Sequence, residues 1–387
     1  MPQDGRLVAD SPEHWRAVRR ALNERRFELT QAASRLYPDA HRVGTTALLC
    51  QEQWIPDRPL DLDEVKLNWV EHAPAAAVNG MEPAAAHVRP LRAKGERYPA
   101  YAEALAAIDP PALFGNRPSY RILSAQLGPG MGHIDLTRGR YFDGVNIGEA
   151  LAHELADSWL ADPALDARRN LPLRDLIGDP CDLSRRNAPC AISTLTLRRE
   201  PSGAASFLLH WRDPAKVTHA GGLRQVIPVG IFQPADNNPA SEQNDLNLWR
   251  SMVREFSEEL LGTTEDYRRL GTPLGYDRWP FYRNLSAARE AGRLRVYCLG
   301  VGVDPLTLAV DILAVAVFDS DLFDATFAGL VAANEEGLVI GGQDAGGALG
   351  VAFTGDVIQR LAGREEPMQA AGAAVLQLAW RAVSELN

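Results

Sequence analysis

The sequence has few cysteines and no long uncharged apolar run, and each shortage excludes a class of protein. Its four cysteines, Cys50, Cys181, Cys190 and Cys298, are scattered without a CxxC pair, which argues against a zinc ribbon or a disulfide framework. No stretch reaches the roughly 18 uncharged apolar residues that a membrane-spanning helix needs, and residues 1–20 lack the apolar core of a secretory signal. We therefore expect four reduced thiols and a cytoplasmic protein that does not enter a membrane.

Positive charge is also in short supply. The chain has 40 Lys and Arg against 50 Asp and Glu, which gives a formal net charge of −10. The field of such a protein repels a phosphate backbone, so the overall charge gives no reason to expect tight nucleic-acid binding. A local basic patch stays open as an exception.

What the chain does have is enough apolar material for a large core. It is 387 residues long and 46% hydrophobic, a length that suggests two domains. A crossing rich in proline and charge leads us to place the boundary near residue 170. We expect an α+β protein with an N-terminal mixed α/β domain (residues 1–170), whose role the sequence does not indicate, and a second domain (residues 171–387).

Apolar periodicity predicts the main elements on both sides of this boundary. In the first part it indicates helices within 13–36 and 146–160 and a strand at 120–127. In the second part, helical periodicity favours an amphipathic helix over 246–262 and a long helix over 368–386. Strand-like runs are expected at the following positions: 191–200, 205–213, 223–232, 293–304 and 311–319.

The helix over 246–262 has acidic residues beside its apolar face. Its large apolar residues recur on one face and are Trp249, Met252, Val253, Phe256 and Leu260. Glu255, Glu258 and Glu259 fall within an arc of about 100° at the edge of this face, and Gly262 stands where a helix often ends. Three neighbouring carboxylates repel one another unless protons or a cation compensate, and a hard divalent cation with oxygen ligands would do so. An ordinary solvated acidic face is the alternative.

These residues also form a recognisable motif. Arg254–Glu259, RE-F-S-EE, resembles the central part of the Nudix signature, in which Arg-Glu, an apolar residue, any residue and Glu-Glu follow one another. The turn at 226–230 and the acidic segment at 334–338 resemble the segments that flank the signature helix, so the likeness covers about residues 185–387. The chain departs from the signature at Ala240 and Leu246, where a glycine and a glutamate are usual. The polar segment 233–245 looks like an insertion.

The resemblance implies a fold, an activity and a set of site residues. A Nudix-type domain is an α/β/α sandwich with a mixed sheet, and its enzymes hydrolyse a nucleoside diphosphate linked to another group. By this likeness Glu255, Glu258 and Glu259 would bind Mg²⁺ or Mn²⁺, and Arg254 would orient one of them. Glu335 or Glu336 would be the base or a further ligand. Such a pyrophosphatase would act on a nucleotide-derived small molecule, and a homodimer is left open.

An aromatic segment after the helix is a candidate for binding the substrate. It contains Tyr276, Arg278, Trp279 and Tyr282, which suit the stacking of a base and the pairing of a phosphate. A loop packed under the core is the alternative. His153 with Glu154, and His219, match no specific metal motif, so we expect them to be structural.

A second function is also consistent with the sequence. Residues 19–31 are rich in arginine and have a superficial likeness to the start of a helix-turn-helix domain. Nudix-like domains are known as ligand sensors, so a DNA-binding regulator with a non-catalytic, nucleotide-sensing domain is the alternative to an enzyme. The expected recognition helix, however, would fall on 37–44, which contains a proline and a glycine. A nucleotide-binding scaffold without activity is a third reading.

Overall fold

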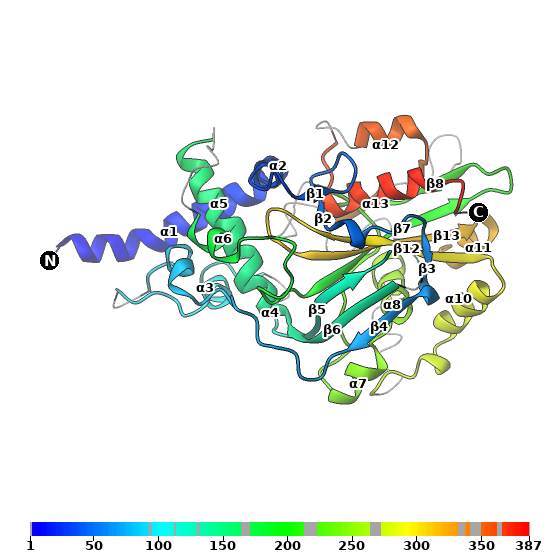
Figure 1. Ribbon diagram of the computed structural model, residues 1–387, viewed down its shortest axis with the longest axis horizontal. Helices are drawn as coiled ribbons and strands as arrows, with labels where there is room; N and C mark the ends of the chain where they lie inside the picture. The colour runs from blue at the N-terminus through cyan, green and yellow to red at the C-terminus, as the bar shows by residue number, and fades with distance from the viewer. Residues whose placement is uncertain are drawn as a thin grey trace.

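The computed structural model of the protein shows a mixture of helices and strands arranged around one large mixed sheet (Figure 1). The residues that the structure describes are 2–92, 95–111, 114–128, 130, 132–163, 171–212, 223–263, 272–331, 337–340, 350–361 and 366–386. The prediction of an α+β protein with a mixed sheet is confirmed.

The main sheet has nine strands among the described residues. In spatial order its path is β1 (His41–Arg42), β2 (Leu49–Cys50), β12 (Leu294–Val303), β13 (Val310–Asp319), β7 (Cys190–Arg199), β8 (Ala205–Phe207) and β15 (Val351–Ala352). Two short strands lie off this path: β3 (Leu60–Asp61) pairs with β12, and β11 (Val229–Ile231) pairs with β7. The central pair, β13 and β7, is parallel, and the other pairs are antiparallel.

The central strands are apolar on both faces because helices cover both. Nearly every residue of β13 is buried, as the continuous apolar run from Ile312 to Phe318 predicts. Helix α13 (Ala370–Arg381) contacts β13, β7 and β12. Helix α8 (Leu248–Glu255) contacts β7, and in Figure 1 it lies behind the sheet while α13 crosses in front. The sheet is therefore an inner layer of the molecule.

Two smaller sheets flank this layer. One has the order β4 (Val65–Trp69), β6 (Gly132–Arg140), β5 (Pro118–Gln126), and the other has the order β10 (Arg224–Val226), β9 (Leu209–Arg212), β14 (Gly337–Ile340). The first is tied to the β11 segment by a hydrogen bond from the Tyr120 N–H to the Phe232 carbonyl, 3.0 Å long. Strand β5 thus lies close to the ends of β7 and β11.

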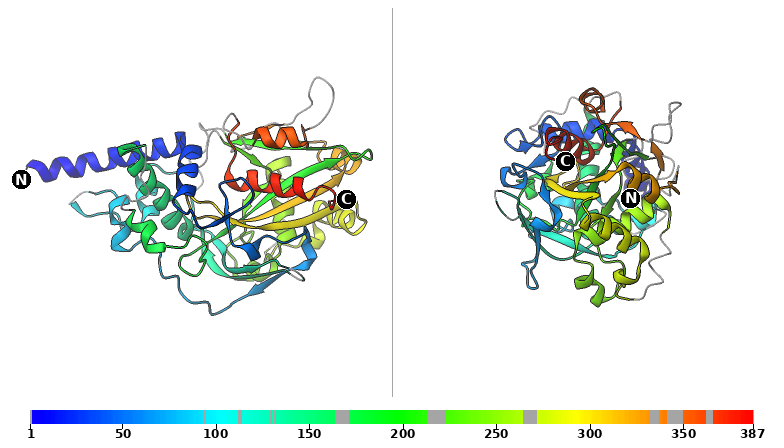
Figure 2. Two further views of the ribbon diagram at one scale, coloured as in Figure 1. Left: turned by 45° about the horizontal axis from the view of Figure 1, so that its top comes forward. Right: turned by 90° about the vertical axis from the view of Figure 1, so that its right-hand side faces the viewer.

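Helices from the first part of the chain pack at one end of the main sheet. α1 (Pro2–Glu24) and α2 (Arg26–Arg35) pack against α5 (Ala150–Ala161) through a separate small core that includes Leu22, Leu29 and Leu155. The first turns of α1 extend beyond the rest of the molecule (Figure 2).

The remaining helical elements are short. Of these, the ones before the main strand β7 are η1 (Glu52–Trp54), η2 (Leu62–Glu64), η3 (Pro83–Val88), α3 (Tyr101–Ile108), α4 (Tyr141–Gly144), η5 (Val145–Glu149) and α6 (Pro172–Ile177). Those after it are α7 (Pro239–Asn244), η6 (Phe256–Leu260), η7 (Tyr276–Arg278), α10 (Pro280–Glu290), α11 (Ser320–Thr326) and α12 (Gly355–Leu361).

Both sides of the predicted boundary at residue 170 contribute to the main sheet. Strands β1, β2 and β3 come from the first part of the chain, and β2 and β3 pair with β12 from the second. One hydrophobic core also contains buried residues of both parts, such as Tyr120 and Phe232, whose rings lie 4.5 Å apart. The division into two domains stays a prediction.

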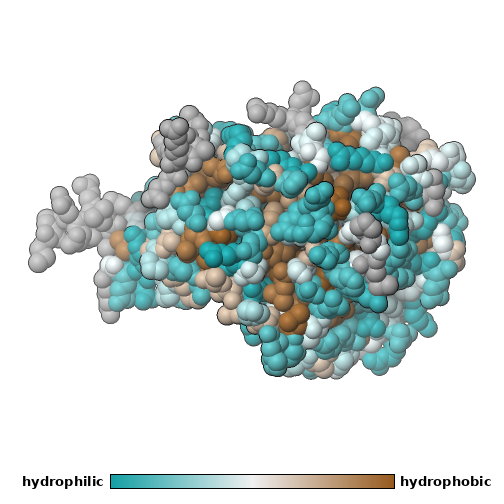
Figure 3. Space-filling view, in the orientation of Figure 1, coloured by the Kyte–Doolittle hydropathy of each residue, from teal (hydrophilic) through white to brown (hydrophobic). Residues whose placement is uncertain are grey.

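The surface and the cysteines agree with the opening expectations. Hydrophilic residues cover much of the face seen in Figure 3, and apolar residues gather in smaller patches toward its middle. Within the described part of the chain, no helix combines the length and the apolar character needed to cross a bilayer. All four cysteines are buried and unpaired in the structure.

Candidate functional site

The predicted amphipathic helix is present and begins and ends as its sequence indicates. Asn247 caps α8, its side-chain oxygen accepting a hydrogen bond from the Arg250 N–H at 2.9 Å. The predicted apolar face is buried at all five positions, namely Trp249, Met252, Val253, Phe256 and Leu260. Gly262 has a φ of 64° and follows the last turn, a backbone conformation that glycine adopts without strain.

The last turn of this helix is a π-helix, η6, which follows α8 directly. Glu258 and Glu259 lie within η6, and Glu255 is the last residue of α8. π-helical turns inside α-helices are rare and often occur at functional sites. The three predicted metal ligands therefore lie at an irregular turn, each half-buried.

Two of these glutamates contact strand β11. The backbone N–H of Val229 donates a hydrogen bond to Glu259 Oε1, 2.8 Å away. Gly230 lies directly against the carboxyl group of Glu255, and a Cβ atom at position 230 would overlap with it. Gly230 is thus a point of close approach between β11 and the helix, and a larger residue there would displace Glu255.

All three glutamates line one large cavity of about 1120 Å³ at the end of the main sheet. The first part of the chain supplies part of its lining, including the arginines Arg26 and Arg117. The carboxylates in its lining are Glu149, Glu255, Glu258, Glu259, Asp304 and Asp311. Among the lining residues that the structure describes, six are thus carboxylates and two are arginines, a balance that favours a cation over an anion.

The glutamates suit a divalent cation by their chemistry, since Mg²⁺ prefers carboxylate oxygens. Among the described residues, however, no group of three or more His, Cys, Asp or Glu side chains is arranged to hold a metal ion. Mg²⁺ is commonly held by one or two carboxylates together with water and substrate phosphates, so a complete protein cage is not required. Glu255 and Glu258 are the residues that fit such a site, and metal binding stays a prediction.

Arg254 lies behind the glutamates, fully buried. Its Nη1 donates to the Tyr276 hydroxyl at 2.7 Å, and its Nη2 donates to the Gln233 carbonyl at 2.6 Å. Asp245 lies 3.4 Å from Nη1 and accepts a hydrogen bond from the Tyr276 hydroxyl at 3.0 Å. The predicted insertion 233–245 therefore supplies two of the groups that hold Arg254.

Arg254 stays protonated although it is buried. Burial by itself lowers the pKa of this guanidinium, but its interactions with Tyr276, Asp245, Glu255 and Glu258 together outweigh that effect and raise the pKa. Arg254 thus carries a permanent positive charge next to Glu255 and Glu258. Its predicted role of orienting a glutamate is not tested by these contacts, which anchor the base of the helix.

The aromatic segment lies away from this cavity. Tyr276 and Trp279 are buried, Tyr282 is half-buried with its ring 5.0 Å from that of Tyr276, and Arg278 is exposed. None of the four is among the described residues that line the cavity. The structure gives Tyr276 a role in holding Arg254, and the proposed substrate contacts of all four residues stay predictions.

The other predicted site residues separate into two groups. Glu335, Glu336 and His219 lie outside the described residues. His153 is buried, with Nδ1 3.1 Å from the Tyr101 hydroxyl, and burial lowers the pKa of its imidazole well below the usual value. Glu154 accepts hydrogen bonds from two backbone N–H groups at the start of α6. His153 and Glu154 are thus engaged within the protein, and the expectation that their role is structural stays a prediction.

The sequence-based prediction missed several charged residues of the cavity lining, among them Glu149 and Asp311. Glu149 forms ion pairs with Arg19 and, at 3.3 Å, with Arg26, and the Glu149 and Arg26 side chains both reach the cavity. Asp311 lies at the start of β13 and hydrogen-bonds to Ser193 on β7. A lone aspartate at the head of an apolar run gives a weak signal, and only the strand pairing reveals its surroundings.

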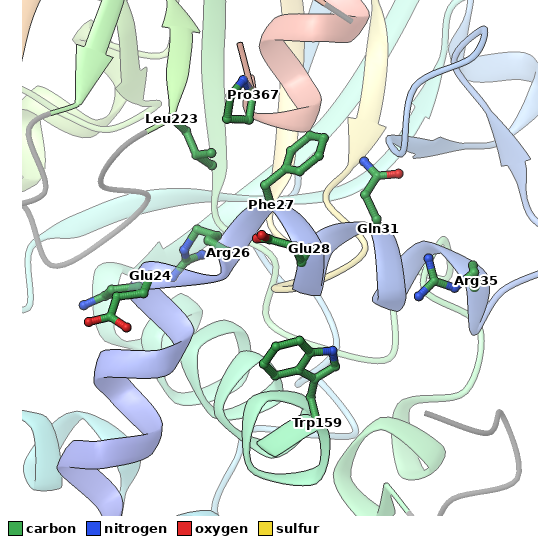
Figure 4. Close-up of a pocket in the computed structure, with 10 residues that line it drawn as sticks. Glu24, Arg26, Phe27, Glu28, Gln31, Arg35, Trp159, Leu223 and Pro367 are labelled. Atoms are coloured by element: carbon green, nitrogen blue, oxygen red, sulfur yellow. The ribbon is translucent and has the colours of Figure 1, made fainter. Parts of the chain in front are cut away.

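A second, smaller cavity of about 350 Å³ lies beside α2. Phe27 extends from α2 toward Leu223 and Pro367, and Trp159 approaches from α5 (Figure 4). Arg26 lines both cavities. Helix α2 therefore contributes a side chain to the large cavity as well as to the small one.

The three glutamates of α8 and η6 and two arginines of the first part of the chain therefore line one cavity of ligand size. No protein-family model matches the chain, and no curated protein matches it.

Proposed function

We propose that this protein is a metal-dependent hydrolase of a nucleoside diphosphate linked to another group, with its C-terminal half folded as a Nudix-type sandwich. The observation that carries the proposal is that Glu255, Glu258 and Glu259, from one helix, line a single cavity of about 1120 Å³. Cavities of several hundred Å³ and more hold small-molecule ligands, so a nucleotide derivative fits by size. The two helices α8 and α13 on opposite faces of a mixed sheet support the proposed fold.

The charges of the cavity support a requirement for a cation. A pyrophosphate group would be repelled by the described lining residues, which include six carboxylates and two arginines. A divalent cation held between Glu255, Glu258 and the phosphate oxygens would remove that repulsion. The charge of the lining is therefore consistent with a bound metal ion and, once that ion is bound, with an anionic substrate.

The chain's own residues would each have a distinct task in the reaction. When bound, the metal would neutralise the pyrophosphate and make its phosphorus more open to attack by water. Glu255 and Glu258 would hold it, while Glu259 fixes β11 beside the helix through the Val229 N–H. Arg254 would keep the helix in place through Gln233 and Tyr276. The proposed base is Glu335 or Glu336.

One observation favours a second candidate, a nucleotide sensor or scaffold that binds its ligand without hydrolysing it. Glu259 is already engaged by a backbone N–H, and the described residues contain no preformed group of three metal ligands. A binding protein needs only the cavity. The DNA-binding form of this candidate is less favoured, because Arg19 and Arg26 point into the protein and pair with Glu149.

The experiment that tests the proposal is a hydrolysis assay on nucleoside triphosphates, nucleoside diphosphate sugars, ADP-ribose and dinucleotides with Mg²⁺ or Mn²⁺. We expect turnover by the wild-type protein that chelation stops and that Glu258→Gln abolishes. Glu290→Gln, an exposed glutamate on α10, is the matched control and should keep full activity. Nucleotide binding without turnover would reject the enzyme in favour of the sensor or scaffold.

A further inference from the structure

Asp311 is an acidic residue inside an apolar strand. It is the second residue of β13, the central strand of the main sheet, and only 8% of its surface is exposed. Ala191 of β7 and Gly302 of β12 are its neighbours in register. A carboxylate in such a place loses its hydration, and burial raises its pKa from the usual value to about 6. The strand would be more stable with an apolar residue here.

One oxygen of this carboxylate has a protein partner and the other does not. Ser193 Oγ, fully buried, donates a hydrogen bond to Asp311 Oδ1 at 2.7 Å. Oδ2 makes no hydrogen bond with any residue that the structure describes, and Asp311 lines the large cavity. Asp304 is a second acid and repels its charge. A neutral hydroxyl is thus the main compensation that the described protein offers for a nearly buried charge.

Small side chains leave room in front of Asp311. Ala191, beside it in the sheet, lines the cavity, as do Ala370 and Ala371 at the start of α13. These residues present methyl groups where larger side chains would fill the space. The cavity therefore extends to the carboxylate.

Asp311 faces the side of the sheet opposite to the glutamates. Gly230, which touches Glu255, is in register with Ile192 of β7. Successive residues of a strand point to opposite faces, so Ser193 and its partner Asp311 lie on the other face. Because both acidic groups line one cavity, the cavity passes around the ends of the strands. A ligand that fills it meets the glutamates with one part and Asp311 with another.

We propose that Asp311 is the anchor for a positively charged nitrogen group, an amine or amidine, of a small molecule bound in this cavity. Such a group supplies both the charge and the N–H donor that Oδ2 lacks, and a charge-assisted hydrogen bond in a site of low polarity is a strong one. This site is additional to the proposed hydrolase site and does not require that hydrolysis takes place.

Benzamidine is a suitable probe, because its planar amidinium group matches a carboxylate. We would titrate the full-length protein with benzamidine at pH 8, where Asp311 is ionised, and follow binding by ligand-observed NMR. Benzyl alcohol, a neutral compound of similar size, is the matched ligand. The wild-type protein should bind benzamidine at least about tenfold more tightly than benzyl alcohol, as expected for one charge-assisted hydrogen bond.

Asp311→Asn then tests the residue itself, since it removes the charge and keeps an oxygen for Ser193. We expect benzamidine binding to weaken by at least about tenfold, while Glu258→Gln, the same change on the other face, leaves it nearly unaltered. Equal binding of benzamidine by the wild type and Asp311→Asn would overturn the proposal. Equal binding of benzamidine and benzyl alcohol by the wild type would also overturn it, and that test does not depend on a variant that folds. Loss of hydrolysis in Glu258→Gln with benzamidine binding intact would separate this site from the proposed enzyme.

Discussion

Two acidic groups reach the same cavity from different helices, and they differ in how their charge is compensated. Glu149, at the end of η5, pairs with two buried arginines, Arg19 and Arg26. Glu255 and Glu258, in contrast, interact with the charge of Arg254, and Arg254 also forms an ion pair with Asp245. The arginines of the first group pair with their carboxylate directly, whereas Arg254 donates its hydrogen bonds to Tyr276 and Gln233 and acts on the two glutamates through its charge.

This difference distinguishes a structural ion pair from a site. Buried charges that are fully compensated by the protein hold elements together, and here they join α1 and α2 to η5. Half-buried carboxylates that line a cavity can instead take part in binding a cation. The comparison therefore gives Glu149 a structural role, and the binding role of the glutamates of α8 and η6 stays a proposal.

The largest effect should come from breaking the compensated group. Glu149→Gln would leave Arg19 and Arg26, 2% and 5% exposed, without their shared carboxylate. Removing one partner of a buried ion pair typically costs about 3–5 kcal/mol, so we expect a loss of that order in the free energy of unfolding, measured by chemical denaturation. Glu96→Gln, in the exposed pair with Arg92, is the control and should change little. A similar small change in both would show that the N-terminal cluster is not structural.

The next effect concerns the buried carboxylate of Asp311. Its pKa is raised in the folded protein to about 6, from 3.8. The folded state therefore holds this proton more firmly than the unfolded state, and the resulting stability is present below about pH 4 and is lost as the pH rises to 6. Relative to Asp311→Asn, the wild type should lose on the order of 3 kcal/mol over this range. Parallel pH profiles of the two proteins in denaturation experiments would contradict the assignment.

A smaller effect is expected behind the glutamates of α8 and η6. Tyr276→Phe removes the hydroxyl that accepts from Arg254 and donates to Asp245. Loss of a buried hydroxyl with two partners should cost about 1–3 kcal/mol in the free energy of unfolding. Tyr297→Phe, whose half-buried hydroxyl makes no hydrogen bond with the described residues, is the matched control. If both variants unfold alike, the contacts of Tyr276 do not stabilise the helix.

Much of the fold could be predicted because local periodicity determines it. The buried face of Trp249, Met252 and Phe256 and the glycine at 262 gave the helix, and the apolar run after Asp311 gave β13. The three glutamates could be placed on one wall for the same reason, since their spacing fixes their relative directions on a helix.

The rest of the cavity lining could not be predicted, because it depends on contacts between distant parts of the chain. Ser193 and Asp311 meet only because β7 and β13 pair in parallel, and Arg26 meets Glu149 only because α2 packs beside η5. The contacts of the aromatic segment could not be predicted for the same reason. Its tyrosine and tryptophan are residue types that stack on a ligand, but Tyr276 instead accepts a hydrogen bond from Arg254 within the protein.

The most direct test of the central claim is a titration of the protein with Mn²⁺, in which the free ion is followed by electron paramagnetic resonance. The wild type should bind Mn²⁺, and the double variant Glu255→Gln/Glu258→Gln should bind it at least about tenfold more weakly, because it lacks both charged ligands. Glu290→Gln should match the wild type. Unchanged Mn²⁺ binding in the double variant, or none in the wild type, would contradict the assignment of these glutamates as a cation site.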